Sequence, residues 1–223
     1  MNREYYENQV VQACSEYAGI AHIGQFRKNG ITPYVTHPAR VAALVSSFLK
    51  RHKDLFIYLS AAWLHDVMED CSIITDGEFS NTIKNHTGED ADIYHFLTNN
   101  DTINIDDGQR IYENTLALTM SQNKSVSKKE RKQVYYDSMR AVDPGVIVIK
   151  YCDRIDNLIT VHHFSQSGFK WYIQETESMM SQLSRPKNIE EYTGIMLDAH
   201  RLALATVRSH LDEVKRRYKV MYK

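Results

Sequence analysis

The stretch "AAWLHDVMED", residues 61–70, places an imidazole and three carboxylates at the end of an apolar run. On a helix, Glu69 lies one turn beyond His65 and shares its face, and Asp70 stands in the same relation to Asp66. Charged groups beside an apolar run are costly unless something pairs with them, and a divalent metal ion is the candidate partner. The alternative is that the helix simply ends here in a solvated acidic turn.

Two further segments supply side chains that can bind a metal. "YVTHPARVAALV", residues 34–45, begins a helix near His37, because Pro38 is tolerated in a first turn. "GVIVIKYCDRIDNL", residues 145–158, is apolar enough for a buried helix, in which the carboxylate of Asp153 must be neutralised. We therefore expect one divalent cation to be bound by His37, His65, Asp66 and Asp153. This mixed nitrogen and oxygen set suits Mn²⁺, Fe²⁺, Zn²⁺ or Mg²⁺ rather than a metal selected by thiolates.

Elsewhere the apolar residues recur mostly at helical spacing, interrupted by only 4 prolines and 9 glycines. The pattern predicts an all-α fold. Helices are expected over residues 3–19, 37–50, 54–70, 109–121, 128–141, 145–162, 169–183 and within 187–222. In the final segment the apolar residues advance by threes and fours, which indicates one buried face of a long helix.

Two regions depart from the helical pattern. "FRKNGITPYVT", residues 26–36, carries Asn29-Gly30 between short β-leaning runs, which predicts a short β-hairpin near residues 26–35. Residues 72–108 are polar and rich in Asp, Asn and Thr, so that we expect short helices and loops there rather than core.

Composition narrows the class of protein. A formal net charge of −1 gives no support to bulk binding of nucleic acid or acidic membranes, and it favours small-molecule chemistry. Cys14, Cys71 and Cys152 form no CxxC pair, which argues against a disulfide framework and for a reducing compartment. The first residues contain no long apolar core, and no window approaches eighteen consecutive apolar residues. We therefore expect a cytoplasmic protein.

The order H, HD, D in "PYVTHPARVA", "AAWLHDVMEDC" and "KYCDRIDNL" resembles the HD superfamily of metal-dependent phosphohydrolases. More narrowly, "RKNG" before the first motif, ED after HD, Asn after "DRID", and the segments "KKERKQVYYDSM" and "YIQETE" resemble the hydrolase domain of RelA/SpoT homologues. The small hydrolases of metazoan SpoT type are the most similar group. The resemblance covers about residues 10–180. It implies an HD-domain helical bundle, a single domain over 1–223 with the C-terminal helix packed on it, and Mn²⁺ as the metal.

The resemblance also implies roles for the remaining candidates. Glu69 and Asp70 orient the attacking water or accept its proton. Arg27 and Lys28 line a nucleotide pocket, and a guanidinium beside an ammonium is typical of phosphate recognition. Asn157 is placed to donate a hydrogen bond to a ribose or base. A solvated turn is the alternative explanation for the two basic residues.

Some positions depart from the family pattern. Cys71 and Cys152 replace the usual Thr and Ala, which are small-for-small exchanges. Asp156 stands where the bacterial enzymes commonly have His, and we expect altered substrate contacts there. The interval between Asp66 and Asp153 is longer than usual, with surplus residues around 88–110 that form an additional lid or interface element.

The sequence therefore predicts metal-dependent hydrolysis of guanosine 3′,5′-bis(diphosphate), ppGpp or pppGpp, at the 3′ position with release of pyrophosphate. The same site chemistry fits the 2′-phosphate of NADPH or an adenosine 3′-pyrophosphate analogue, and these substrates stay open. A non-catalytic module that binds or sequesters a nucleotide is a further alternative, although it has no need of both metal ligands and a water-activating carboxylate. The expected partner is a small nucleotide rather than nucleic acid or a membrane. The oligomeric state stays open, with a homodimer as one option.

Overall fold

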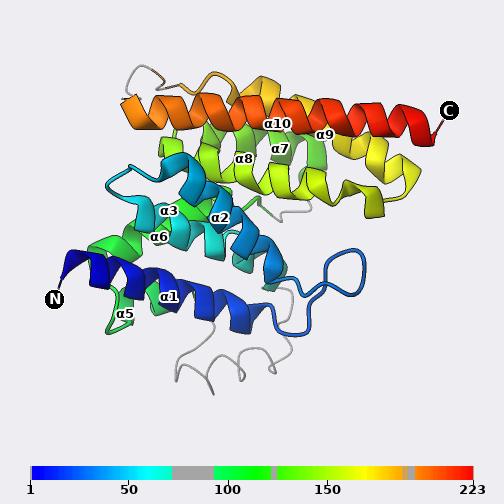
Figure 1. Cartoon of the computed structure of the whole chain (residues 1–223). Coiled ribbons are helices and arrows are strands. Elements are labelled where there is room, and N and C mark those ends of the chain that lie inside the picture. The colour runs from blue at the N-terminus through cyan, green and yellow to red at the C-terminus, as the bar shows by residue number, and fades with distance from the viewer. Residues whose placement is uncertain (1, 72–92, 122–124, 188, 190–193, 223) are drawn as a thin grey trace.

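The computed structural model describes residues 2–71, 93–121, 125–187, 189 and 194–222, and these form a bundle of helices (Figure 1). The helices are α1 (Arg3–Ala21), α2 (Thr36–Leu49), α3 (Leu55–Leu64), η1 (Val67–Cys71), α5 (Ile93–Asn99), α6 (Ile105–Leu118), α7 (Lys128–Met139), α8 (Pro144–Ile159), η2 (Val161–His163), α9 (Gln166–Leu183) and α10 (Gly194–Met221). The predicted all-α fold is confirmed for this part of the chain. None of the described helices is long and apolar enough to span a membrane.

The predicted β-hairpin is wrong, because the segment forms a turn without strands. A single isolated antiparallel bridge joins Phe26 and Pro33. Gly30 has φ = +69°, as a tight turn after Asn29 requires. The Asn29 side chain accepts hydrogen bonds from the backbone N–H groups of Ile31 and Thr32, which directs these donors into the turn. Two backbone hydrogen bonds flank this bridge, from Arg27 N–H to Thr32 O and from Tyr34 N–H to Gln25 O, and the pairing ends because α2 begins at Thr36.

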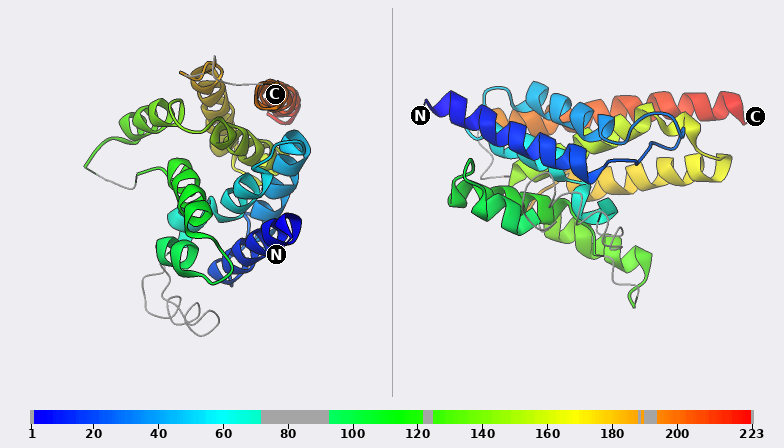
Figure 2. Two further views of the ribbon diagram at one scale, coloured as in Figure 1. Left: turned by 90° about the vertical axis from the view of Figure 1, so that its left-hand side faces the viewer. Right: turned by 90° about the horizontal axis from the view of Figure 1, so that it is seen from below.

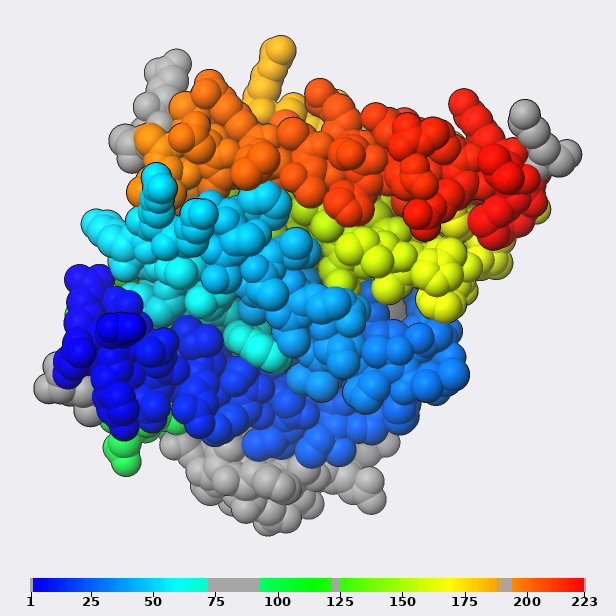
Figure 3. Space-filling view, in the orientation of Figure 1, coloured from blue at the N-terminus to red at the C-terminus, as the bar shows by residue number. Residues whose placement is uncertain are grey.

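Two apolar clusters form the core, and α3 contributes to both. One cluster joins α2, α7, α8, α9 and α10, and the other joins α1, α5 and α6. Figure 1 shows α10 along one side of the bundle and α1 along the other, with α2, α3 and α8 between them, and the end-on view in Figure 2 agrees. The space-filling view, in the orientation of Figure 1, shows α10 along the upper edge of the molecule (Figure 3).

The long C-terminal helix follows the predicted face. The residues buried along α10 include Met196, Ala199, Ala203, Val207 and Leu211, at the expected spacing of three and four. They pack mainly on α8, whose own run from Val146 to Ile149 is fully buried. The apolar periodicity of these two helices therefore fixes how they pair.

The region predicted to be loops and short helices is core in part. Residues 72–92 lie outside the described residues. The short helix α5, however, buries Ile93, Phe96 and Leu97 in the second cluster and packs mainly on α6, and its Phe96 ring stacks on Tyr17 of α1 with 4.3 Å between centroids. The following helix begins at Ile105, earlier than predicted, because the Asn104 side chain caps it.

The helix predicted over residues 54–70 is broken. α3 ends at Leu64, and after two turn residues the chain continues as the wider π-helical turn η1. Such π turns are often found at functional sites. This break separates the HD pair from the Glu-Asp pair, so that the four side chains no longer share one regular helix face.

We expect Gly145→Ala to destabilise the packing of α8 against α3. A Cβ at Gly145 would lie 2.1 Å from the Tyr58 ring, and that ring is held because its hydroxyl donates to Asp143 at 2.9 Å. Overpacking of this kind costs about 1–3 kcal/mol of unfolding free energy, measurable by urea or thermal unfolding. The control is Gly19→Ala in α1, where the new Cβ meets nothing within 4 Å and should stabilise slightly. Equal stability of the Gly145 variant and the wild type would contradict the prediction.

Candidate active site

Three helices bring predicted metal ligands together. His37 lies in the first turn of α2, His65 directly follows α3, and Asp153 lies within α8. These side chains are buried, with 1%, 2% and 6% exposure, respectively. One ligand atom from each lies within 4.8 Å of those of the other two. Two imidazoles and a carboxylate from distant parts of the chain thus converge on one point.

Asp66 adjoins this group through the two histidines. Its Oδ2 atom lies 3.2 Å from Nε2 of His65 and 3.4 Å from Nε2 of His37. Asp153 Oδ1 lies 3.2 Å from the same His37 nitrogen. Two ligands bound at about 2.1 Å to one cation are separated by about 3.0–3.4 Å at the usual bond angles. These distances therefore fit side chains that share a cation.

His65 provides an independent test of that fit. Its Nδ1 atom lies 2.7 Å from the backbone oxygen of Ala62, which can only accept, so Nδ1 carries the proton. Its Nε2 atom is buried and makes no hydrogen bond, and its neighbour at 3.2 Å is an acceptor, Oδ2 of Asp66. A buried lone pair without a donor is unfavourable, and a bound cation would satisfy it. The donor set therefore fits a divalent metal.

Positive groups keep the buried carboxylates ionised. Although burial by itself raises the pKa of Asp153, the nearby ammonium of Lys150 and the hydrogen bond with His37 hold that pKa well below its usual range. Lys150 Nζ donates to Asp153 Oδ2 at 2.8 Å, and Asn157 Nδ2 donates to Oδ1 at 2.5 Å. Burial likewise acts on Asp66, whose pKa is nevertheless lowered by the two histidines. Both carboxylates are therefore ready to bind a cation at neutral pH.

The Glu-Asp pair on η1 lies beside the ligand group. Glu69 accepts a hydrogen bond from the backbone N–H of Met120 at 2.5 Å. The Tyr34 hydroxyl lies 2.7 Å from Oδ2 of Asp70 and also 2.7 Å from Oδ2 of Asp66, so it links the two carboxylates. Partial loss of hydration raises the pKa of both Glu69 and Asp70. A carboxylate with a raised pKa is a better proton acceptor.

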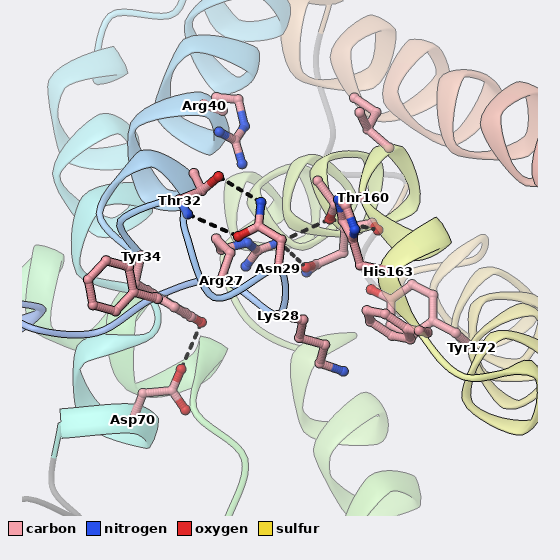
Figure 4. A pocket seen from close by; sticks show the side chains of 14 residues that line it. Arg27, Lys28, Asn29, Thr32, Tyr34, Arg40, Asp70, Thr160, His163 and Tyr172 are labelled. Carbon is pink, nitrogen blue, oxygen red and sulfur yellow. Dashed lines mark hydrogen bonds between the residues drawn. The ribbon is translucent and has the colours of Figure 1, made fainter.

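A pocket of about 550 Å³ opens next to these groups (Figure 4). Arg27 lines it and donates to the side chains of Asn157 at 2.8 Å and Thr160 at 3.2 Å. The ammonium of Lys28 lies 3.4 Å from the centroid of the Phe164 ring. Asp70 lines the same pocket, so the pocket reaches the carboxylates beside the metal ligands. Its volume is typical of small-molecule sites.

A second, smaller hollow of about 190 Å³ is lined by Glu69 and by residues of α7, α8 and α9. Lys128 and Lys132 line it, with their ammonium groups 4.8 Å and 4.5 Å from the centroid of the Trp171 ring. Lys150 also lines this hollow. Cationic side chains therefore line both the large pocket and this smaller hollow.

Several residues around the site did not come from the sequence reasoning. Lys150 could have been found, since it lies one turn before Asp153 on the same helix. Tyr34 and Arg40 gave no signal, because their contacts join segments that are distant in the chain. Asp156 was expected to alter substrate contacts, whereas it is buried against His37 and Arg40.

No family model matches the chain. Over 205 residues it is 26% identical to the guanosine-3′,5′-bis(diphosphate) 3′-pyrophosphohydrolase of Aquifex aeolicus, covering 92% of this chain and 23% of the relative. Over 221 residues it is 27% identical to the enzyme of that name from Vibrio cholerae, covering 95% and 25%. It is 23% identical over 209 residues to a GTP pyrophosphokinase of Myxococcus xanthus, covering 94% and 23%. The chain thus spans about a quarter of the length of these curated relatives.

A solved structure has the same fold. It is described as a metazoan ortholog of SpoT that hydrolyzes ppGpp, and it matches with a TM-score of 0.58 and 22% identity over 93% of this chain and 94% of the other. The sequence matches and the shared fold confirm the resemblance inferred from the motifs. In both sequence and fold, the chain is similar to a SpoT-like hydrolase domain of the HD type.

Proposed function

We propose that this chain hydrolyses ppGpp or pppGpp at the 3′ position in a reaction that depends on a divalent cation, with Mn²⁺ as the expected metal. The observation that carries the proposal is the buried group of His37, His65 and Asp153 directly beside a nucleotide-sized pocket. The relatives named as 3′-pyrophosphohydrolases supply the substrate class. The products would be pyrophosphate and GDP or GTP.

Different residues of the chain would bind the cation and activate the water. A cation bound by His37, His65, Asp66 and Asp153 would lower the pKa of a water molecule and polarise a phosphoryl oxygen. Glu69 and Asp70, both with raised pKa, would orient that water and accept its proton.

The charge distribution around the site suits a substrate with two diphosphate groups. Arg27 and Lys28 lie in the larger pocket, and Lys128 and Lys132 lie in the smaller hollow, which Glu69 also lines. A nucleotide base would stack in the larger pocket, whose lining includes the Phe26, Phe164 and Tyr172 rings.

The direct test is a substrate comparison. Purified chain with Mn²⁺ should release pyrophosphate from ppGpp and lose that activity in EDTA, with recovery when Mn²⁺ is restored. Parallel reactions with NADPH measure release of phosphate, and faster turnover there would overturn the proposed substrate. If ppGpp raises the melting temperature but is not turned over under any metal, the binding module replaces the enzyme.

Arg27→Ala should weaken substrate binding more than it slows the chemical step. Arg27 is only 13% exposed and lies in the pocket rather than among the ligand atoms. A hydrogen bond to a charged group is worth about 1.5–3 kcal/mol, which corresponds to a rise in KM of about 10–100-fold. Steady-state kinetics with ppGpp measure both constants, and Arg208→Ala on the exposed side of α10 is the control. An unchanged KM would remove Arg27 from the pocket.

A further inference from the structure

Asp156 is a buried carboxylate in direct contact with a candidate metal ligand. It is 1% exposed, and its Oδ2 atom lies 2.6 Å from Nδ1 of His37. Arg40 donates to it twice, from Nε to Oδ1 at 2.5 Å and from a terminal nitrogen to Oδ2 at 3.1 Å. Arg27 approaches the same Oδ2 atom at 3.6 Å. Asp156 thus contacts Nδ1 of His37, whereas Asp66 and Asp153 lie beside the Nε2 atom of that ring.

These contacts determine which nitrogen of His37 carries a proton. An ionised carboxylate can only accept hydrogen bonds, so Nδ1 of His37 must donate to Asp156. The Nε2 atom, which faces Asp153 and Asp66, is then the ring nitrogen that gives up its proton when a cation binds. The two guanidinium groups hold Asp156 in its ionised form and fix its orientation.

We propose that Asp156 is a positioning residue for the metal site, which holds the His37 ring in the tautomer and orientation that present Nε2 to a divalent cation. Outer partners of this kind typically change metal affinity by about 10–100-fold when they are removed. Because Arg27 and Arg40 line the large pocket and also contact Asp156, the carboxylate connects that pocket to His37. The inference rests on the proposed metal site but not on the identity of the substrate.

Asp156→Asn is a sharp test because the amide has nearly the same shape. The guanidinium of Arg40 can only donate, so it would draw the amide oxygen and turn the NH₂ group toward His37. Nδ1 would then have to accept a hydrogen bond, and the proton would move to Nε2, where it competes with the cation. We expect the Mn²⁺ dissociation constant to rise by about 10–100-fold in isothermal titration. Nitrogen-15 NMR with Zn²⁺ bound as a diamagnetic cation should show the His37 proton on Nδ1 and the cation on Nε2 in the wild type, and this pattern should weaken in the variant.

Two further variants separate positioning from general stability. Asp137→Asn removes an exposed carboxylate of α7 and should leave the Mn²⁺ dissociation constant unchanged. Arg40→Met combined with Asp156→Asn should recover part of the affinity, since without Arg40 the amide oxygen can turn back to His37. An Mn²⁺ dissociation constant within twofold of the wild type in Asp156→Asn, or a wild type that binds no Mn²⁺, would overturn the inference. Failure of the wild type to cleave ppGpp while it binds Mn²⁺ would overturn only the proposed function.

Discussion

Replacing Asp66 by asparagine should lower Mn²⁺ affinity and hydrolysis together. Asp66 Oδ2 lies beside both histidine Nε2 atoms, so its charge acts directly on a bound cation. Loss of an outer partner already costs about 10–100-fold in affinity, and loss of a ligand should exceed that. Stabilisation of transition-state charge by the cation is worth several kcal/mol, so that kcat/KM should fall by about a thousandfold.

The variant should still fold, which keeps the result interpretable. Asp66 is partly exposed, and an asparagine oxygen can still accept the hydrogen bond of Tyr34. Isothermal titration with Mn²⁺ and a pyrophosphate-release assay give the two readouts, and thermal unfolding without metal checks the fold. Asp101→Asn, at an exposed position before α6, is the matched control. Wild-type Mn²⁺ affinity in the Asp66 variant would place the cation elsewhere.

Local patterns were sufficient for most of the fold. The periodicity of Met196, Ala199 and Ala203 lies within one helix, so that it needs no knowledge of distant contacts. Ile93, Phe96 and Leu97 have the same helical spacing, but the polar residues around them led to a prediction of loops and short helices rather than core. The predicted hairpin was wrong because the pairing of Phe26 with Pro33 is cut short by the start of α2 at Thr36.

The site depends on long-range contacts that no spacing in the chain reveals. The break after α3 is stabilised by partners from other segments, since Met120 donates to Glu69 and Tyr34 reaches Asp70. The contact of Asp156 with His37 joins α8 to α2. Residue types at short spacing can therefore identify candidate metal ligands. The groups that orient those ligands depend on how the helices pack, which the spacing does not show.

Glu69→Gln should separate metal binding from turnover. Glu69 accepts a hydrogen bond from the backbone N–H of Met120, and its amide counterpart can still accept that bond. The Mn²⁺ dissociation constant and KM should therefore change by less than about threefold, while kcat falls by about 100- to 10,000-fold through loss of the proton acceptor.

The pH dependence of kcat tests whether Glu69 acts as the proton acceptor. Partial desolvation raises the pKa of Glu69, so that the ionised, proton-accepting form is lost as the pH falls through a value above the usual range of glutamate. The wild type should therefore lose kcat on the acid side at a higher pH than an exposed glutamate would give, and Glu69→Gln should show a much flatter acid limb. Asp70→Asn, beside it on η1, is the matched comparison, because its pKa is also raised and it is linked to Asp66 through Tyr34. If Glu69→Gln weakens Mn²⁺ binding as much as Asp66→Asn does, Glu69 is a ligand and the division of roles between them is wrong.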